Sequence, residues 1–448
     1  MKPTHTLLRA RWLRSMLALT LMAGAGAAHA QLRLPSINLP SAPSIGGIDP
    51  ERLGARGAAQ VAERALPDLR ALRLDQVGKL LRQHRDVLEA DPRGEPIVRR
   101  EILAWAPSPA ALAAAQAEGL RVERDMGGDQ PELRMLVLRV PDRADTAAVL
   151  ARLRALDPAG VYDFNHIYTG SAARPMADPA PAPAARGDAG ARAPGGGPRV
   201  GLVDSGVDST HAVFRDARIE RWGCAGQPHP SAHGTAVAAL MVGQSGRFHG
   251  AAPQANLYAA DIYCDSPTGG SADKIAAALA WLAAEKVAVI NLSLVGPANQ
   301  TLERIVGAMQ QRGHLLVAAV GNDGPAAPPL YPASYPGVVG VSAVDRNGRA
   351  LPEAARGPQV MFAAPGNNMV SAAIGAPPFR PVRGTSFASP LVAALLAASV
   401  ARPDKGQSAA AVAALAKQAA GRDGTTVSNE TGYGIVGAAL RVDPASIR

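Results

Sequence analysis

Three side chains that could act together in nucleophilic catalysis occur in the chain order Asp204, His233 and Ser386. A serine nucleophile needs an imidazole base that accepts its proton and a carboxylate that orients the imidazole. The last histidine of the chain is His314, so any histidine that serves Ser386 must come before it. Asp204 ends an apolar, strand-like segment, and His233 stands near the start of an apolar segment typical of a helix. These positions predict an acyl-transfer site in which the acid comes first, the base second and the nucleophile last.

The motifs around these three residues agree with that order. The acid lies in DSGVD (204–208), the base in HGTAVA (233–238) and the nucleophile in GTSFASP (384–390), and together they resemble the subtilisin-like serine protease family, the subtilases. An α/β-hydrolase elbow would need glycine at position 388, which is alanine, and a histidine after the serine. Each residue alone could be structural, Ser386 for example as a helix N-cap, but three motifs of one family in order favour catalysis. The resemblance implies a serine endopeptidase with an acyl-enzyme intermediate; the alternative is a latent or inactive protein of this fold that acts as a binding module.

A fourth candidate is Asn322, which follows the apolar segment LLVAAV (315–320) and Gly321. The tetrahedral intermediate of acyl transfer needs hydrogen-bond donors at the place where its oxyanion develops, and a side-chain amide can provide one. The resemblance to subtilases implies that Asn322 is this donor, with the backbone N–H of Ser386 as the second. The alternative is a turn asparagine that tolerates a positive φ.

Two segments resemble those that border the substrate cleft of subtilases. One follows the strand-like VAVINLSL (287–294), and the other is a glycine pair that would let a peptide backbone approach closely. The resemblance implies that substrate binds between them as an added β-strand. Many subtilases have glycine where Val295 stands, which indicates a tighter pocket mouth. The candidate substrate-binding residues are Ser293, Leu294, Val295, Gly296, Gly269 and Gly270; a core strand and a loop are the structural alternative.

The segment LYPASYP (330–336) resembles a subtilase segment that contains a cis proline and borders the S1 pocket. Leu330 would then form the floor of this pocket. Because the segment contains no acidic residue, we expect an apolar P1 side chain in the substrate and no trypsin-like preference for arginine.

The N-terminus and the overall charge bear on location and partners. Residues 1–30 contain four basic residues, an apolar run from 16 to 28 and a final AHA, which is the pattern of a secretory signal peptide. The run is shorter than the roughly twenty residues of a membrane span, so we expect export to the periplasm or the medium without a membrane anchor. The net charge is +9, but the 46 basic residues are scattered along the chain, which argues against a nucleic-acid partner.

The chain has only two cysteines, Cys224 and Cys264. In an exported protein a disulfide between them is plausible. Two buried free thiols are the alternative, because sequence spacing says nothing about their geometry.

The remaining sequence divides into segments of different composition. Residues 31–95 have no readable function, although periodicity from 66 to 88 indicates helices. Residues 96–169 predict a small α+β domain with the ferredoxin-like order βαββαβ. This order resembles the pro-domain that serves subtilases as folding chaperone and intramolecular inhibitor; an accessory domain that stays attached is the alternative. Residues 170–198 are rich in Ala, Pro and Gly and are expected to be a linker in which maturation cleavage falls.

Residues 199–448 predict the catalytic domain. Apolar strands alternate here with helices, which predicts an α/β fold with a doubly wound parallel sheet. Asp204 and Asn322 are expected at the carboxyl ends of strands, where ligands bind in such sheets, and His233 and Ser386 at the starts of helices.

No cofactor or metal ion is expected. Many subtilases bind calcium in a loop after the histidine helix, and calcium prefers several oxygen ligands. The corresponding loop, GQSGRFHG (243–250), has no carboxylate, and Val213 stands where an aspartate ligand would be expected. Weak calcium sites elsewhere stay open. The expected partners are therefore protein or peptide substrates and the chain's own N-terminal domain.

Overall fold

The computed structural model describes residues 69–126, 130–170, 197–420 and 427–447. The chain divides into Met1–Ala58 and a second compact unit, Ala59–Arg448, to which all of these residues belong. The expected signal peptide and nearly all of the expected linker, as well as residues 31–68, lie outside the described residues.

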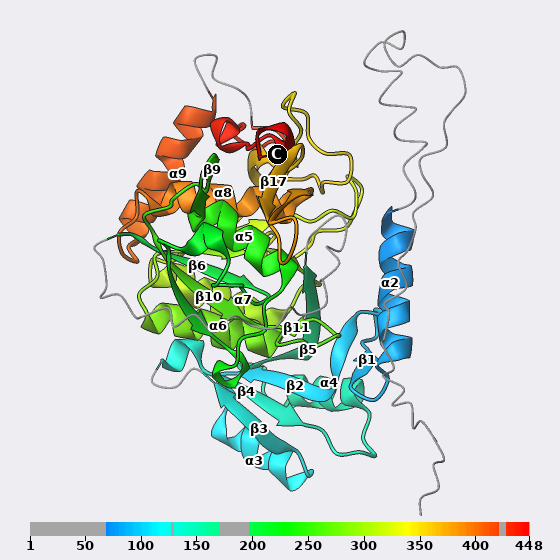
Figure 1. Ribbon diagram of the computed structural model, residues 1–448. Coiled ribbons are helices and arrows are strands. Elements are labelled where there is room, and N and C mark those ends of the chain that lie inside the picture. Colours follow the sequence, from blue (N-terminus) through cyan, green and yellow to red (C-terminus); the bar gives the residue numbers. More distant parts are fainter. Residues whose placement is uncertain (1–68, 127–129, 171–196, 421–426, 448) are drawn as a thin grey trace, which may run out of the picture. The chain divides into compact units, whose positions relative to one another are not determined.

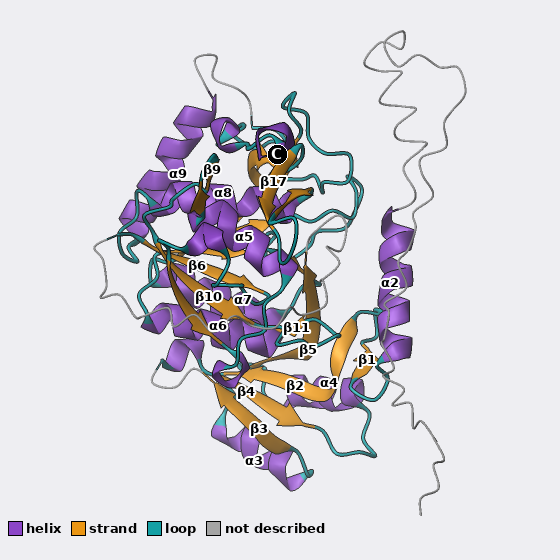
Figure 2. Cartoon of the chain, viewed as in Figure 1, coloured by secondary structure: helices purple, strands orange, loops and turns teal. Residues whose placement is uncertain are grey.

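A seven-stranded sheet forms the centre of the C-terminal part (Figures 1 and 2). Its order is β16-β15-β14-β12-β6-β10-β7, and all neighbouring strands are parallel. The chain enters at β6 in the interior of the sheet and extends it in both directions, so the expected doubly wound α/β fold is confirmed. The strands are β6 (Arg199–Asp204), β7 (Arg218–Trp222), β10 (Asn256–Asp261), β12 (Val289–Leu292), β14 (Leu315–Ala319), β15 (Val339–Val344) and β16 (Val360–Pro365).

Helices cover both faces of this sheet because its strands are apolar on both sides. In β6, Val200 and Leu202 pack into the core on one face, and Val203 packs into the core on the other. The first core includes α5 (Ala232–Val242), α8 (Thr385–Ala397) and α9 (Lys405–Ala420). The second includes α6 (Ala272–Ala284) and α7 (Gln300–Gln311).

A smaller antiparallel sheet of residues 96–170 lies against α6 and α7. Its own strands have the order β5-β2-β4-β3, and with two helices they follow one another along the chain as βαββαβ. Leu103, Met135 and Val137 of this sheet share the core of α6 and α7, whereas its other face packs on α3 and α4. The elements are β2 (Pro96–Trp105), α3 (Pro109–Ala117), β3 (Arg121–Met126), β4 (Met135–Arg139), α4 (Thr146–Leu156) and β5 (Val161–Gly170).

Short elements complete the chain. The periodicity from 66 to 88 corresponds to one helix, α2 (Leu69–Gln83), followed by a strand, β1 (Leu88–Ala90), that pairs with β2. Two-stranded pairs are β8 (Gln244–Ser245) with β9 (Phe248–His249) and β17 (Met369–Ala372) with β18 (Phe379–Val382). Single 3₁₀ turns occur at Pro131–Leu133, Ala212–Phe214, Cys224–Gly226, Ala438–Leu440 and Pro444–Ile447. In the part of the chain that the structure describes, no helix has both the length and the apolar character needed to cross a membrane.

One expected strand is divided. The segment 287–294 forms β12 and then, after Ser293, the short β13 (Leu294–Val295). β13 leaves the parallel sheet and pairs with β5, as does β11 (Gly270–Ser271) on the other side of β5. Figure 1 shows β5 reaching from the smaller sheet to β11.

Candidate active site

Asp204 and His233 form the first pair of the site. Asp204 is the last residue of β6 and His233 the second residue of α5, and their Oδ1 and Nδ1 atoms lie 2.8 Å apart. The buried Asp204 Oδ1 also accepts hydrogen bonds from the backbone N–H of Ser205 at 2.6 Å and from its hydroxyl at 3.0 Å. Three donors therefore hold this carboxylate in place, and the bond to Nδ1 orients the imidazole with Nε2 on its far side.

Ser386 is the second residue of α8, and its segment lies beside the imidazole. The ring of the next residue, Phe387, has its centroid 5.4 Å from that of His233. The N-cap of α8 is Gly384, with a φ of +126°, a conformation that glycine adopts readily. Ser386 is therefore not the N-cap of this helix, as the structural alternative had it.

Asn322 lies against the start of the same helix. The backbone N–H of Thr385 donates to Asn322 Oδ1 at 3.1 Å, and the N–H of Gly321 donates to Thr385 Oγ1 at 3.3 Å. Because an N–H group can only donate, the amide oxygen of Asn322 must face Thr385 and its NH₂ group the other side. This orientation suits an amide that donates to an oxyanion formed at Ser386.

Ser293 supports the helix that carries Ser386. Its hydroxyl donates to the backbone oxygen of Ser386 at 3.0 Å, lies 3.1 Å from Ser389 Oγ and accepts from Asn291 Nδ2 at 2.8 Å. Among the substrate-binding candidates, Ser293 thus directs its side chain into the protein.

Leu330 and Val295 come together next to Asn322. A Cβ atom built on Gly321 would lie 2.5 Å from Leu330 Cδ1 and 3.5 Å from Val295 Cγ1. Leu330 is buried, and the peptide bond that follows it by one residue, Tyr331–Pro332, is cis. Two apolar side chains from separate segments therefore flank Gly321, the residue before Asn322.

The strand β5 lies between the two candidate substrate-binding segments. Thr169 and Gly170 pair with Val295 and Leu294 on one side, and Ile167 and Tyr168 pair with Ser271 and Gly270 on the other. At the end of the strand, a Cβ atom on Gly170 would lie 3.9 Å from His233 Nε2. Gly269 has a φ of +97° and approaches the carbonyl oxygen of Tyr168 so closely that a Cβ atom would lie 2.7 Å from it.

Tyr168 of β5 packs on the segment of Gly296 and Pro297, a contact that the sequence did not indicate. Its ring lies so close to Gly296 that a Cβ atom there would be 2.5 Å from the ring, and its hydroxyl donates to the carbonyl oxygen of Pro297 at 2.9 Å. Complete burial raises the pKa of Tyr168 well above its usual value, with a further contribution from the hydroxyl of Tyr335. The phenol is therefore a neutral donor. In the sequence, Tyr168 stands two residues before the expected linker, but nothing in its neighbourhood indicates what its side chain contacts.

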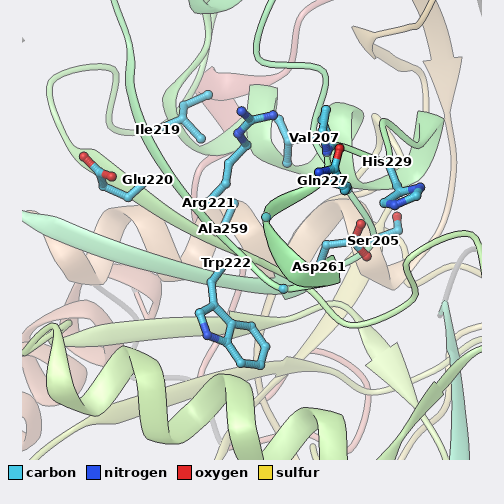
Figure 3. A pocket seen from close by; sticks show the side chains of 14 residues that line it. Ser205, Val207, Ile219, Glu220, Arg221, Trp222, Gln227, His229, Ala259 and Asp261 are labelled. Atoms are coloured by element: carbon cyan, nitrogen blue, oxygen red, sulfur yellow. The ribbon is translucent and has the colours of Figure 1, made fainter. Parts of the chain in front are cut away.

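Cys224 and Cys264 form a disulfide with their Cα atoms 5.2 Å apart, so the free-thiol alternative is wrong. It joins the segment after β7 to the segment after β10, and closing a loop of this length stabilises the fold by about 3–4 kcal/mol in the chain-entropy model. Burial raises the pKa of the neighbouring Asp261, with a smaller contribution from the negative charge of Asp204. Asp261 lines a hollow of about 290 Å³, and Figure 3 shows Ser205, His229 and Asp261 together at one end of it.

The expected calcium loop forms the β8–β9 pair. Within the described ranges, one group of three potential metal ligands lies close together: Cys224, Asp261 and Cys264. Two of its three members are joined in the disulfide.

The doubly wound fold and the chain order Asp204, His233 and Ser386 together are typical of one class of α/β proteins. A model of the subtilase family matches residues 195–434, more than half of the chain. The chain belongs to the subtilase family.

Individual relatives support this assignment. The chain is 35% identical over 211 residues to a thermostable alkaline protease of Halalkalibacterium halodurans. The aligned region covers 45% of this chain and 56% of that protein. It is 36% identical over 208 residues to Subtilisin Savinase of Lederbergia lenta, over 44% of this chain and 74% of that protein. In most of the curated relatives it matches, the chain spans about half of the length.

Among solved structures, fervidolysin from Fervidobacterium pennivorans, described as a keratinolytic enzyme related to subtilisin, aligns with a TM-score of 0.61. The alignment covers 79% of this chain and 62% of fervidolysin at 20% identity. At this identity the likeness shows the fold.

Proposed function

We propose that the protein is an exported serine endopeptidase made as a precursor, with Asp204, His233 and Ser386 as its triad. The observation that carries this proposal is the 2.8 Å contact between His233 and Asp204 beside the helix start that bears Ser386. In the reaction, Ser386 Oγ attacks the carbonyl carbon of the substrate and His233 Nε2 accepts the hydroxyl proton. His233 then gives this proton to the departing amine, and water releases the acyl group by the reverse sequence.

Asn322 stabilises the negative charge of the tetrahedral intermediate. Its amide oxygen is engaged by Thr385, so its NH₂ group is directed to the other side of the helix start. With the N–H of Ser386 it forms a two-donor site whose geometry is set before substrate arrives. Leu330 and Val295 flank the same place and suit a substrate with an apolar P1 side chain.

The domain of residues 96–169 acts as an intramolecular inhibitor. β5 occupies the cleft as a strand that pairs on both sides, which is how a peptide substrate is expected to bind. Its end lies beside the imidazole, since a Cβ atom built on Gly170 would be 3.9 Å from His233 Nε2. After cleavage in residues 170–198, this strand remains in the cleft as a bound product until the domain leaves.

Polar contacts hold the inhibitory domain on the catalytic domain. Asn165 Nδ2 donates to Glu101 Oε2 at 2.8 Å and to Asp273 Oδ1 at 2.9 Å, and Arg124 pairs with both carboxylates. Asp273 belongs to α6 of the catalytic domain, whereas the other three residues belong to the inhibitory domain. Because buried carboxylates are costly without partners, Asn165 and Arg124 stabilise Glu101 and Asp273 while the two domains are in contact.

The enzymatic proposal is tested by covalent labelling of the serine. A fluorophosphonate probe is expected to label the protein after the N-terminal domain has been removed, and Ser386→Ala is expected to abolish the label, read by gel fluorescence and by peptide mass. Ser408→Ala is the control, because this buried serine of α9 donates to the oxygen of Gly313 and should leave labelling intact. A wild-type protein that takes up no label once its cleft is free would favour the inactive binding module.

The tyrosine subsite gives a prediction for substrates. A chromogenic amide of the chain's own residues 167–171 should be cleaved with a kcat/KM about tenfold higher than the same peptide with Tyr168→Phe, because the Pro297 oxygen loses its donor. The matched control carries Ile167→Val and should be cleaved like the parent peptide. Equal cleavage of the tyrosine and phenylalanine peptides would show that the hydroxyl plays no part in selection.

A further inference from the structure

The helix α2 lies in residues 31–95, the region for which the sequence indicates no function. None of the side chains described for it is fully buried, and Leu74 is 63% exposed. A helix with so little burial in its own domain is held by few contacts. Its contacts with other parts of the chain therefore decide where it lies.

Arg73 of α2 makes the decisive contact. Its Nη1 atom lies 2.9 Å from Asp323 Oδ2 in the catalytic domain, and its Nη2 atom lies 3.5 Å from Glu95 Oε2 next to β2. The side chains of Arg73 and Asp323 are only 19% and 20% exposed. One guanidinium group thus joins the two domains through two carboxylates.

A second contact lies beside the first. A Cβ atom built on Gly324 would be 3.4 Å from Leu69 Cδ1, so the first residue of α2 packs over this glycine. Asp323 and Gly324 directly follow Asn322, the candidate oxyanion donor. The contacts that Arg73 and Leu69 make with Asp323 and Gly324 therefore fall on the loop that carries this donor.

We propose that α2 is a latch that binds the 322–324 loop and slows departure of the N-terminal part after the chain has been cut. The proposal rests on the inhibitory role proposed for residues 96–169 and adds a second attachment to it. α2 is connected to that domain through β1, so it leaves only when Arg73 separates from Asp323. On the catalytic domain, α2 contacts the carboxylate of Asp323 and packs with Leu69 over Gly324. The segment that binds this surface is a basic helix of the same chain.

The test measures binding without relying on catalysis. The full chain with Ser386→Ala receives a recognition sequence for a site-specific protease between residues 171 and 196, and is cut there after purification. The dissociation rate of the two parts is then followed by size-exclusion chromatography after dilution or by surface-based kinetics. Adding Arg73→Ala should raise this rate about two- to fivefold, the upper part of the range for one partly exposed charge contact.

Lys79→Ala provides the matched control on the same helix. Lys79 pairs only with Asp75 of α2 among the described contacts, so its loss should leave the dissociation rate unchanged. The charge exchange Arg73→Asp with Asp323→Arg should return the rate toward that of the parent protein, whereas Arg73→Asp alone should not. Equal rates for Arg73→Ala and the parent, or an equal acceleration by Lys79→Ala, would overturn the latch. Two parts that separate at once in the parent protein would instead overturn the inhibitory role of residues 96–169.

Discussion

Replacing Ser386 or His233 by alanine is expected to lower kcat of the processed enzyme about 10⁶-fold, and replacing both is expected to cost little more. This scale is that of subtilisin, in which the members of the triad act as one unit. The physical reason is that a serine without its base, or a base without its serine, leaves the same unassisted reaction at the oxyanion site. Hydrolysis of a chromogenic peptide by the three variants, with protein freed of its N-terminal part by an added protease, measures the effect.

The controls separate loss of chemistry from loss of structure. Ser408→Ala removes a hydroxyl of similar burial from α9 and should leave kcat within a factor of a few of the parent. Asn322→Ala should retain the triad and lower kcat by about 10²–10³, the cost of one oxyanion donor in subtilisin. Losses for Ser386→Ala and His233→Ala that multiply in the double variant would contradict the assignment of these residues to one catalytic unit.

The triad could be predicted from the sequence because each member is fixed by local structure. Asp204 ends an apolar strand, and His233 and Ser386 each stand second in a helix. A parallel sheet brings such positions to one edge, so the order of motifs along the chain predicts that they lie together. The orientation of Asn322 was not readable, because it depends on a backbone N–H from a helix 63 residues away.

Contacts between segments far apart in the chain could not be predicted from the sequence. Tyr168 and Pro297 are 129 positions apart, and Arg73 and Asp323 are 250 positions apart. Neither pair produces a pattern in the nearby sequence. A strand tyrosine that is buried can have the same sequence neighbours as one that is exposed. The direction of the Ser293 side chain was also not predictable. The same motif would be present whether its hydroxyl faced α8, as it does, or a substrate.

Self-processing gives the second large effect. After removal of the signal peptide, the wild-type protein is expected to be cut completely, whereas Ser386→Ala is expected to remain full length, because the cut is made by the chain's own serine. The position follows from β5: Gly170 faces His233, so the scissile bond should be one of the first three bonds after Gly170. N-terminal sequencing and intact mass of the purified proteins measure both outcomes.

The time course should distinguish a pro-domain from an attached accessory domain. Peptide hydrolysis should stay low while the cut N-terminal part is bound, since β5 still pairs with β11 and β13, and should rise as that part is degraded. Ser408→Ala should follow the wild type, which excludes a general effect of removing a buried hydroxyl. Full activity in a species that begins near Gln31 and is uncut after Gly170 would show that β5 can leave the cleft while its domain stays attached. In that case residues 96–169 would be an accessory domain, and the strand in the cleft would be one position of a movable segment.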